Sequence, residues 1–319
     1  MTKLVLTNNP GDDHLQGLRD TFPAVTFVVA PDTATQRREL PDADGIVGWP
    51  QREALSAARQ LRWVHVLSAG IEGIARAPEL IEMDGVILTN SRGAHAPAIA
   101  DHCFAFVLAL ARSIPTILED QRAKRWERVA RAAEMRTLHG SVMGLLGLGN
   151  IGSEIAGRAL GFGMELRGVD ANPAARCPGV AEVWGLERLD DLLRVADIVA
   201  VALPITAQTR GMIGARELAL MKPSTYLCVM SRGGIVDQEA LADALQQGRL
   251  GGAGLDATEP EPLPPTSPLW ASPNIIISPH CSYASQESWG RLERILYENI
   301  RRFAAGDTLL NLCDKRAGF

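Results

Sequence analysis

Residues 142–152 read VMGLLGLGNIG, and this stretch decides the fold. Its first five residues form an apolar run of strand length, and Gly147, Gly149 and Gly152 follow with the spacing GxGxxG. A helical pattern, Asn150–Leu160, starts within the glycine motif. A strand, a glycine-rich turn and a helix in this order are typical of a βαβ unit that binds a dinucleotide.

Each position of the motif has a physical task. Gly147 permits the tight turn, Gly149 lets the backbone approach a pyrophosphate, and Gly152 lets the helix pack against the strand. The first N–H groups of the helix have no acceptor inside the helix, so they attract an anion. We therefore expect the coenzyme to contact Gly147, Gly149, Asn150, Ile151 and Gly152.

The next expected strand, Glu165–Val169, ends directly before Asp170. A carboxylate at this place accepts hydrogen bonds from the ribose hydroxyl groups of NAD and repels the 2′-phosphate of NADP. Arg176 follows closely and weakens the distinction, because a guanidinium can bind that phosphate. The alternative role for Asp170 is to cap a turn or a helix. We predict that Asp170 binds the ribose and that the coenzyme is NAD, with NADP as the second choice.

Short apolar runs alternate with helical patterns on both sides of the motif. We expect strands at Leu4–Leu6, Val25–Val29, Gly45–Val47, Trp63–Val66, Val86–Leu88, Val142–Leu146, Glu165–Val169, Ile198–Leu203, Thr225–Val229, Ala253–Leu255 and Ile275–Ile277. We expect helices at Asp12–Thr21, Arg52–Ala58, Asn150–Leu160, Leu186–Val195, Ala215–Met221, Asp237–Gln247 and Gln286–Ala304. The 319 residues suffice for about two domains. The predicted fold class is therefore α/β, with two doubly wound parallel-sheet domains.

One segment interrupts this alternation. Ala98–Arg112, AIADHCFAFVLALAR, predicts a long apolar helix, and a more charged arm, Ile117–Arg136, follows it. The helix is too uniformly apolar for a surface helix, so we expect it to be buried. Burial in the core of its own chain is one explanation. Burial between domains is another, and we favour burial between two subunits.

The composition excludes several classes of protein. Hydrophobic residues make up 46% and charged residues 22%, and the net charge is −5 with a pI near 5.7, so we expect no nucleic-acid partner. The longest apolar run, Cys103–Ala111, is too short to cross a bilayer, and the first residues are typical of a strand rather than a signal peptide. The five scattered cysteines indicate a reducing compartment. We expect a soluble cytoplasmic enzyme without a membrane partner.

Polar residues follow the last expected strands. These segments are Ser231–Asp237, Gly254–Leu263 and Ile277–His280, each after or at the end of a strand. The carboxyl ends of parallel strands meet at one edge of a sheet, where open α/β sheets bind their ligands. We therefore expect the three segments to lie beside the glycine motif.

At this point the sequence resembles the D-isomer-specific 2-hydroxyacid dehydrogenases. The resemblance covers nearly the whole chain in an ordered series of motifs. These are Val66–Gly70, Gly147–Gly152, Leu203–Thr206, Met221–Pro223, Ser231–Asp237, Asp256–Leu263 and Pro279–His280. It implies a Rossmann coenzyme domain, residues 99–283, inserted into a flavodoxin-like substrate domain formed by residues 1–98 and 284–319. It also implies a homodimer through the coenzyme domains.

The resemblance assigns the catalytic groups to Arg232, Glu261 and His280. Histidine suits proton transfer to a carbonyl oxygen near neutral pH, and a carboxylate beside it stabilises the protonated imidazole and fixes its tautomer. The planar fork of Arg232 suits the carboxylate or carbonyl of a 2-keto acid. The alternative is that Arg232 is a surface ion pair and His280 a packed core residue.

The resemblance also implies contacts for other residues. Ser68, Ala69 and Gly70 match the loop whose backbone N–H groups hold the substrate carboxylate, together with Arg232. Further coenzyme contacts are implied for Leu203, Pro204, Thr206 and Asp256, with turn packing and strand-end capping as the alternatives for Thr206 and Asp256. The remaining histidines lack the spacing of metal ligands, so we expect no metal.

The chain departs from the family pattern in three places. Val229 stands where many relatives have Asn, Thr258 where an aromatic residue is frequent, and Cys281-Ser282 where small or apolar residues are common. Glu261 argues against formate, because formate dehydrogenases of this superfamily use Gln there.

We predict NAD-dependent interconversion of a D-2-hydroxy acid and its 2-keto acid, both small anions. Glyoxylate or hydroxypyruvate reduction is the favoured activity, and a bulkier 2-keto acid is the near alternative. The runner-up from a different class is an NAD(H)-sensing, corepressor-like binding protein on the same fold.

Overall fold

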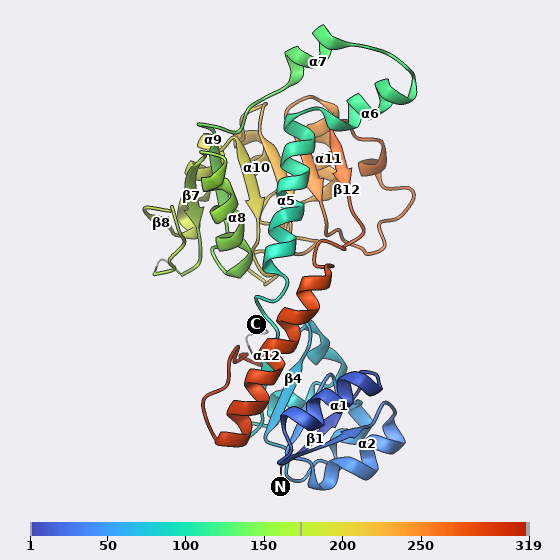
Figure 1. Cartoon of the computed structure of the whole chain (residues 1–319). Helices are drawn as coiled ribbons and strands as arrows, with labels where there is room; N and C mark the ends of the chain where they lie inside the picture. The colour runs from blue at the N-terminus through green and yellow to red at the C-terminus, as the bar shows by residue number, and fades with distance from the viewer. Residues whose placement is uncertain (1, 173, 317–319) are drawn as a thin grey trace. The chain divides into compact units, whose positions relative to one another are not determined.

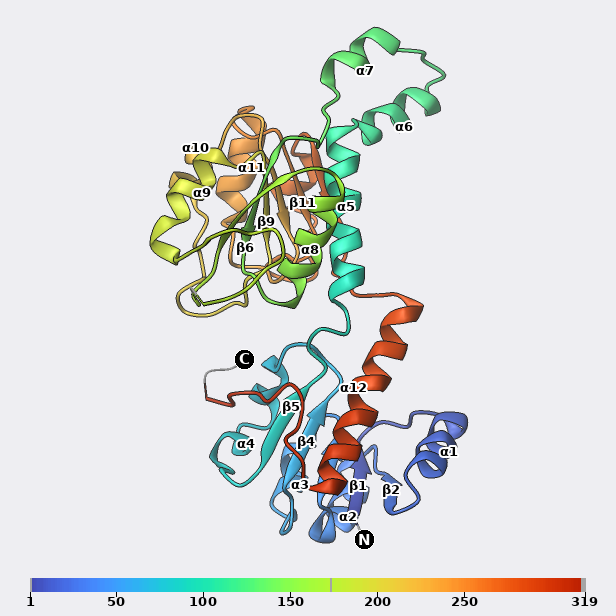
Figure 2. The ribbon, with the colours of Figure 1, turned by 60° about the vertical axis from the view of Figure 1, so that its left-hand side comes forward.

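The computed structural model describes residues 2–172 and 174–316. The chain forms two compact units, which Figures 1 and 2 colour along the sequence. Unit 1 is built from Met1–His95 and Ser285–Phe319, as far as these are described, and unit 2 from Ala96–Ala284. The predicted domains change over at 98/99 and 283/284. The first changeover in the structure is earlier because a helix that belongs wholly to unit 2 begins at Ala96.

Unit 1 has a sheet of five parallel strands among its described residues, in the order β2-β1-β3-β4-β5. The strands are β1 (Thr2–Leu6), β2 (Val25–Val29), β3 (Gly45–Val47), β4 (Trp63–Val66) and β5 (Ile87–Asn90). This is the flavodoxin-like order.

Helices cover both faces of this sheet. They are α1 (Asp12–Thr21), α2 (Thr33–Glu39), α3 (Arg52–Leu55), α4 (Glu79–Glu82) and α12 (Gln286–Ala305), with the 3₁₀ helices η1 (Leu40–Asp42) and η2 (Glu72–Arg76). Successive side chains of a strand point to opposite faces. Leu4 therefore packs with Leu296 of α12, whereas Val5 packs with Leu40 and Leu80 on the other face.

Unit 2 has a sheet of seven parallel strands among its described residues, in the order β12-β11-β10-β9-β6-β7-β8. The strands are β6 (Val142–Leu146), β7 (Glu165–Val169), β8 (Val183–Trp184), β9 (Ile198–Val201), β10 (Tyr226–Val229), β11 (Gly252–Leu255) and β12 (Ile275–Ile277). The strand order reverses between β6 and β9. Open sheets of this doubly wound type bind dinucleotides at that switch point.

The two faces of this sheet are covered by different helices. α5 (Ala96–Ala111) and α8 (Asn150–Gly161) pack on one face, and α9 (Leu189–Val195), α10 (Ala215–Leu220) and α11 (Gln238–Gln246) on the other. The 3₁₀ helices η3 (Leu186–Arg188) and η4 (Pro268–Ala271) lie in its connections.

The apolar helix α5 is buried inside unit 2. Cys103, Val107 and Ala111 have no exposed surface, and they pack in one cluster with Ile155 of α8 and Cys228 of β10. Burial within a single chain therefore explains why this helix is apolar. A second subunit, which we expected to cover it, is not needed for that purpose.

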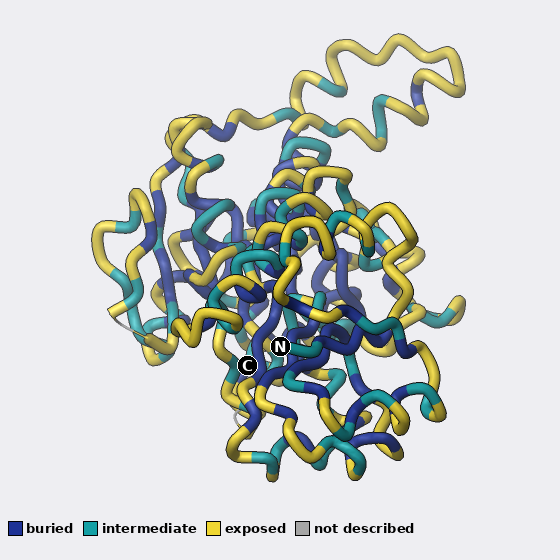
Figure 3. Tube along the Cα trace, turned by 60° about the horizontal axis from the view of Figure 1, so that its bottom comes forward, coloured by how far each residue is buried: buried dark blue, intermediate teal, exposed yellow. Residues whose placement is uncertain are grey.

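The arm that follows consists of two helices rather than one continuous segment (Figures 1 and 2). α6 (Ile114–Arg122) and α7 (Arg128–Glu134) are separated by a turn in which Lys124 has a φ of 56°. Asp120 ties the turn together through ion pairs of 2.7 Å to Arg125 and 2.8 Å to Arg131. Most of the arm is coloured as exposed in Figure 3. Its Trp126 has 92% of its surface exposed.

Among the described residues, no single helix is long and apolar enough to cross a membrane. The criterion is met only by α5 and α6 taken together, two helices bent by 63° to each other.

The differences from the expected elements are local. β5 is Ile87–Asn90 instead of Val86–Leu88, and α3 ends at Leu55. The polar residues Thr89 and Asn90 join β5 because their side chains find hydrogen-bond partners inside the unit. The two-residue strand β8 is too short to leave a periodic signal.

Candidate active site

The glycine loop joins β6 to α8 at the switch point of unit 2. Gly147 has a φ of 93°, a left-handed conformation that suits glycine. A Cβ on Gly152 would overlap the carbonyl oxygen of Gly147, so glycine is needed there for close packing. Apart from the two residues next to it in the chain, no described residue has an atom within 4 Å of the position a Cβ on Gly149 would take. Glycine is therefore favoured at the three positions for different reasons: conformation at Gly147, close packing at Gly152 and, at Gly149, the open space that suits a pyrophosphate.

The start of α8 offers N–H donors beside that space. Asn150 is the first helical residue after Gly149, and the N–H groups of Asn150, Ile151 and Gly152 precede the first residue with an acceptor in this helix, Ser153. Such donors at a helix N-terminus attract phosphate. Their contact with a coenzyme remains a prediction, but the local geometry suits it.

Asp170 lies at the end of β7 and contacts the glycine loop. Its Oδ2 accepts a hydrogen bond of 2.7 Å from Leu148 N, and its Oδ1 accepts one of 2.8 Å from Asn172 N. The carboxylate thus stabilises the glycine loop and the turn after β7. Asp170 therefore lies where the ribose prediction requires it, and it also caps a turn, as the alternative proposed. Each oxygen has a second lone pair, which can accept a hydrogen bond from a ribose hydroxyl group in addition.

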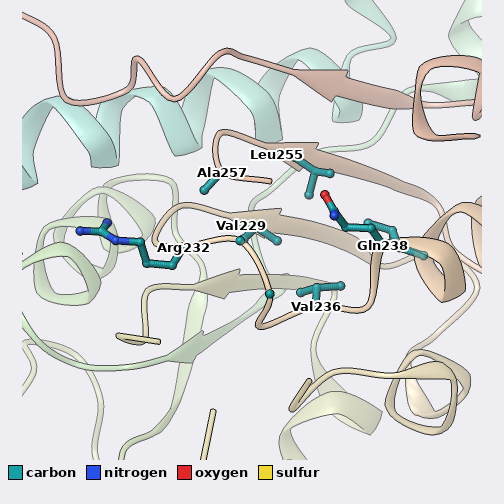
Figure 4. A pocket seen from close by; sticks show the side chains of 9 residues that line it. Val229, Arg232, Val236, Gln238, Leu255 and Ala257 are labelled. Atoms are coloured by element: carbon teal, nitrogen blue, oxygen red, sulfur yellow. The ribbon is translucent and has the colours of Figure 1, made fainter. Parts of the chain in front are cut away.

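Arg232 follows β10 and is half-buried. Its Nη1 donates a hydrogen bond of 2.8 Å to Ser231 O. Figure 4 shows the guanidinium group pointing away from Val229, Leu255 and Ala257, which line a cavity of about 10 Å³ under the loop. That cavity has room for about one water molecule. The substrate that Arg232 is expected to bind therefore belongs on the opposite side, where the guanidinium points.

His280 and Glu261 form a pair at the carboxyl ends of β11 and β12. His280 Nδ1 lies 2.9 Å from Glu261 Oε2 and 3.1 Å from Oε1. Thr258 N donates a second hydrogen bond of 3.1 Å to the same carboxylate. The exposed fractions of the two side chains are 37% for His280 and 40% for Glu261. The alternative of a packed core histidine does not describe this residue.

The turn that carries His280 is held by Asp256. This carboxylate is 2% exposed and accepts hydrogen bonds from Ser278 Oγ at 2.5 Å, Cys281 N at 3.0 Å and Ser282 N at 3.1 Å. Burial alone raises the pKa of Asp256, but the hydrogen bonds from Ser278 and Ser282 outweigh it and lower the pKa, so the carboxylate stays ionised. His280 itself has a φ of 49°, which is uncommon for a residue with a side chain and typical of functional sites.

Leu203, Pro204 and Thr206 follow β9, next to the glycine loop in the strand order. Leu203 is buried and Pro204 exposed. Thr206 stabilises its own turn, because its Oγ1 accepts a hydrogen bond of 3.2 Å from Thr209 N. This contact agrees with the turn-packing alternative, and the predicted coenzyme contacts of the segment remain predictions.

The expected substrate loop follows β4 in unit 1. The carbonyl oxygen of Ser68 accepts a hydrogen bond from Ser91 N at 3.0 Å, and that of Ala69 accepts one from Asn90 Nδ2 at 2.6 Å. In a trans peptide the carbonyl and the next N–H point in opposite directions. The N–H groups of Ala69 and Gly70 therefore face away from β5, and neither has an acceptor in the described chain. Two free N–H groups in one loop can bind a carboxylate.

The sequence did not single out two residues that organise these loops. Asn90 orients the loop after β4, and His102 of α5 lies 2.9 Å from Ser278 Oγ, which in turn donates to Asp256. The signal available for Asn90 was a polar residue two positions after the predicted strand Val86–Leu88. For His102 there was none, because its partner is distant in the sequence. Within residues 2–172 and 174–316, no group of three His, Cys, Asp or Glu side chains is placed to hold a metal ion.

A dinucleotide loop at the switch point and an imidazole–carboxylate pair at the same end of the sheet together indicate an oxidoreductase of the doubly wound class. Residues 104–282 match the family model described as D-isomer specific 2-hydroxyacid dehydrogenase, NAD binding domain. The chain belongs to the D-isomer specific 2-hydroxyacid dehydrogenase family, as the motifs had indicated.

Individual relatives agree with this assignment. A glyoxylate reductase from Korarchaeum cryptofilum is 34% identical over 267 residues, which are 82% of this chain and 79% of the relative. A D-isomer specific 2-hydroxyacid dehydrogenase from Xanthobacter autotrophicus, solved with NADPH and MES, has a TM-score of 0.81 at 30% identity and covers 100% of this chain and 99% of its own. The apo D-mandelate dehydrogenase of Rhodotorula graminis has a TM-score of 0.84 at 26% identity, covering 98% and 97%.

Proposed function

We propose that this protein interconverts a D-2-hydroxy acid and its 2-keto acid with NAD(H), and that its activity is the reduction of glyoxylate or hydroxypyruvate. The observation that carries the proposal is the pair of His280 Nδ1 and Glu261 Oε2, 2.9 Å apart, at the sheet end that also bears Arg232. The similarity to a glyoxylate reductase supports the substrate class.

The pair is arranged for proton transfer. Because Glu261 accepts from Nδ1, that nitrogen carries a hydrogen, and Nε2 is left to exchange a proton with the substrate. In the reductive direction Nε2–H of His280 gives its proton to the carbonyl oxygen of the keto acid. In the oxidative direction the neutral Nε2 removes the hydroxyl proton. The negative charge of Glu261 stabilises the imidazolium, which is the proton donor in reduction and the form produced in oxidation.

Arg232 and the loop after β4 are proposed to bind the substrate. The guanidinium of Arg232 would pair with the substrate carboxylate or polarise its carbonyl oxygen. The N–H groups of Ala69 and Gly70, next to Ser68, would donate hydrogen bonds to the substrate carboxylate, and neither has a competing acceptor among the described residues. The proposed substrate is thus an anion whose charge these hydrogen-bond donors would hold.

When bound, NAD(H) supplies or accepts the hydride at the substrate carbon. The loop Gly147–Gly152 is proposed to hold its pyrophosphate and Asp170 its ribose, with Leu203, Pro204, Thr206 and Asp256 as further contacts. The carboxylate of Asp170 favours NAD, because a 2′-phosphate beside it would be repelled. The similar Xanthobacter enzyme was solved with NADPH, so both coenzymes belong in the test.

A steady-state assay tests the proposal. The purified protein is offered glyoxylate, hydroxypyruvate, pyruvate and a bulkier aromatic 2-keto acid, each with NADH and with NADPH, and coenzyme oxidation is followed. We expect the highest kcat/KM with glyoxylate or hydroxypyruvate and NADH. Tight NADH binding without turnover of any keto acid would contradict the proposal and support the NAD(H)-sensing binding protein instead.

We also propose a homodimer through unit 2, formed by the arm. Trp126 is 92% and Val129 83% exposed, an unusual exposure for large apolar side chains. Light scattering is expected to give twice the chain mass, and Trp126→Glu with Val129→Glu to give the monomer mass. A wild-type monomer would contradict this proposal.

For the location we propose the cytoplasm. The five cysteines support it, because all of them are free thiols in the structure and three are buried. Fractionation of source cells with an antibody against the protein is expected to find it with cytoplasmic markers. Recovery in an oxidising compartment would contradict the proposal.

A further inference from the structure

Asn90, at the carboxyl end of β5, is buried beneath the expected substrate loop. It is 2% exposed, and its Nδ2 donates a hydrogen bond of 2.6 Å to the carbonyl oxygen of Ala69. On the other side its Oδ1 accepts a hydrogen bond of 3.1 Å from Arg92 N. The amide group is therefore fixed at both ends. It links a loop after β4 to a turn after β5.

The contact with Ala69 decides where the next N–H points. The carbonyl oxygen of Ala69 and the N–H of Gly70 belong to the same planar peptide, so holding the one toward Asn90 holds the other away from it. A hydrogen bond of 2.6 Å from Ser68 Oγ to Gly70 O fixes the following peptide as well. Asn90 thus orients a free donor without touching what that donor binds.

The C-terminal segment holds Asn90 in turn. Asn311 O accepts a hydrogen bond of 3.3 Å from Asn90 N, and Asn311 Nδ2 donates to the carbonyl oxygens of Asn90 at 3.1 Å and Arg92 at 2.9 Å. Leu312 forms an antiparallel bridge with Thr89, so the segment lies along β5. Asn311 has a φ of 55°, a left-handed conformation that Asn tolerates better than most residues.

We propose that Asn90 is a positioning residue for substrate binding and that Asn311 of the C-terminal segment fixes its backbone. The inference rests on the proposed function, because it assumes that Ala69 and Gly70 bind the substrate carboxylate. Asn90 then sets the affinity for the keto acid through the orientation of the Ala69–Gly70 peptide. The coenzyme contacts lie in unit 2 and are independent of it.

Two variants remove the links without adding charge. Asn90→Ser is too short to reach Ala69, and it is expected to raise KM for glyoxylate about tenfold, as the loss of one buried hydrogen bond would. Asn311→Gly keeps the left-handed backbone and deletes only the side chain, so we expect a smaller rise of about threefold. In both variants kcat and the Kd for NADH stay near the wild-type values, since the lost interaction serves ground state and transition state alike.

The control variant is Lys315→Met in the same segment. Lys315 Nζ donates to Met83 O at 2.6 Å and Val86 O at 3.0 Å, at the opposite end of β5. It is expected to lower Tm without changing KM. An unchanged KM in Asn90→Ser would overturn the inference. An equal rise of KM in Lys315→Met would also overturn it, because general loosening of the segment would then be the cause.

Hydrogen exchange separates this inference from the proposed function. Faster exchange of the Ser91 amide, which donates a hydrogen bond of 3.0 Å to Ser68 O of the loop, is expected in Asn90→Ser than in Lys315→Met. If the wild type reduces no keto acid but this exchange difference is present, the proposed function fails while the positioning of the loop stands. If the wild type is active and the exchange is unchanged, the inference alone fails.

Discussion

Both units carry polar side chains on or directly after their strands, but the two regions use them in opposite ways. In unit 1 the buried polar cluster consists of Trp63, His65, Thr89 and Ser91, and none of them has exposed surface. In unit 2 the open polar edge consists of Arg232, Glu261 and His280, whose polar groups are partly exposed.

The polar groups of the buried polar cluster form hydrogen bonds with one another. Trp63 Nε1 donates to Thr89 Oγ1 at 2.9 Å, and Thr89 Oγ1 lies 2.9 Å from His65 Nδ1. His65 Nε2 lies 3.2 Å from Ser91 Oγ, so a neutral His65 with its hydrogen on Nε2 serves every partner. Burial lowers the pKa of His65 to about 4, which keeps it neutral. Substitutions in this region should therefore alter stability, whereas those at the open polar edge should alter turnover.

The largest effect is expected for His280→Ala. Removing the proton donor should lower kcat by roughly 10²–10⁴, the usual contribution of general acid–base catalysis. The half-exposed imidazole contributes little packing, so Tm should change little. Steady-state kinetics with glyoxylate and a thermal melt check both parts. Near wild-type turnover would show that His280 does not transfer the proton. Substitution at the open polar edge would then not affect turnover, contrary to the difference proposed between the two regions.

Glu261→Gln should come next, with a loss in kcat of roughly 10²-fold. The amide keeps the size of the side chain but loses the charge that stabilises the imidazolium, and its NH₂ group can favour the wrong tautomer of His280. The pH profile of kcat/KM should shift as well, because the imidazolium loses its ionised partner. A profile identical to that of the wild type would show that the 2.9 Å contact has no part in proton transfer.

The buried polar cluster should instead affect how the free energy of unfolding changes in acid. Burial lowers the pKa of His65 to about 4 in the folded protein, against the ordinary value of 6.5 for histidine, so the unfolded chain binds more protons between these pH values. The stability that His65 contributes is then complete above pH 6.5 and falls as the pH drops toward 4. Between pH 7 and pH 5 the free energy of unfolding should decrease by about 2 kcal/mol from this group.

Urea unfolding of His65→Gln and His14→Gln at both pH values isolates that contribution. His65→Gln should lose about 2 kcal/mol of the acid-induced decrease, whatever its absolute stability. His14 is exposed, so His14→Gln should retain the wild-type decrease. If the free energy of unfolding decreased equally in both variants between pH 7 and pH 5, the buried histidine would not be the acid-sensitive group.

The sequence predicted the fold well where the signal is local. The predicted strands Val25–Val29, Val142–Leu146 and Glu165–Val169 are present with the predicted bounds, and parallel sheets follow from their alternation with helices. The extent of β5 and the break between α6 and α7 were missed, because both depend on polar groups that find partners only in the folded chain. The burial of α5 was expected, but its covering partner is α8 of the same unit.

The site shows the same limit. Polar residues after successive strands predicted that Arg232, Glu261 and His280 would share one sheet end, since topology alone brings these ends together. The roles of Asn90 and Asp256 depend on contacts with loops from other strands, such as Asn90 with Asn311 and Asp256 with Cys281. No spacing in the sequence records such pairings, and periodicity describes only what a residue does within its own element.

The smallest expected effect is the change in NADH affinity on substituting Gly149. Comparing Gly149 with Gly152 of the same loop separates an effect on binding from an effect on stability. Gly149→Ala adds a methyl group in open space with a φ of −70°, so Tm should remain unchanged. The same methyl group would occupy the space proposed for the pyrophosphate, and the Kd for NADH should rise about tenfold, or about 1.4 kcal/mol. Gly152→Ala, in contrast, should lower Tm, because its Cβ would overlap Gly147 O inside the protein. Fluorescence titration with NADH and thermal melts of both variants decide the matter. A Gly149→Ala protein that binds NADH as the wild type does would place the coenzyme elsewhere, and the open space beside the loop would then need another explanation.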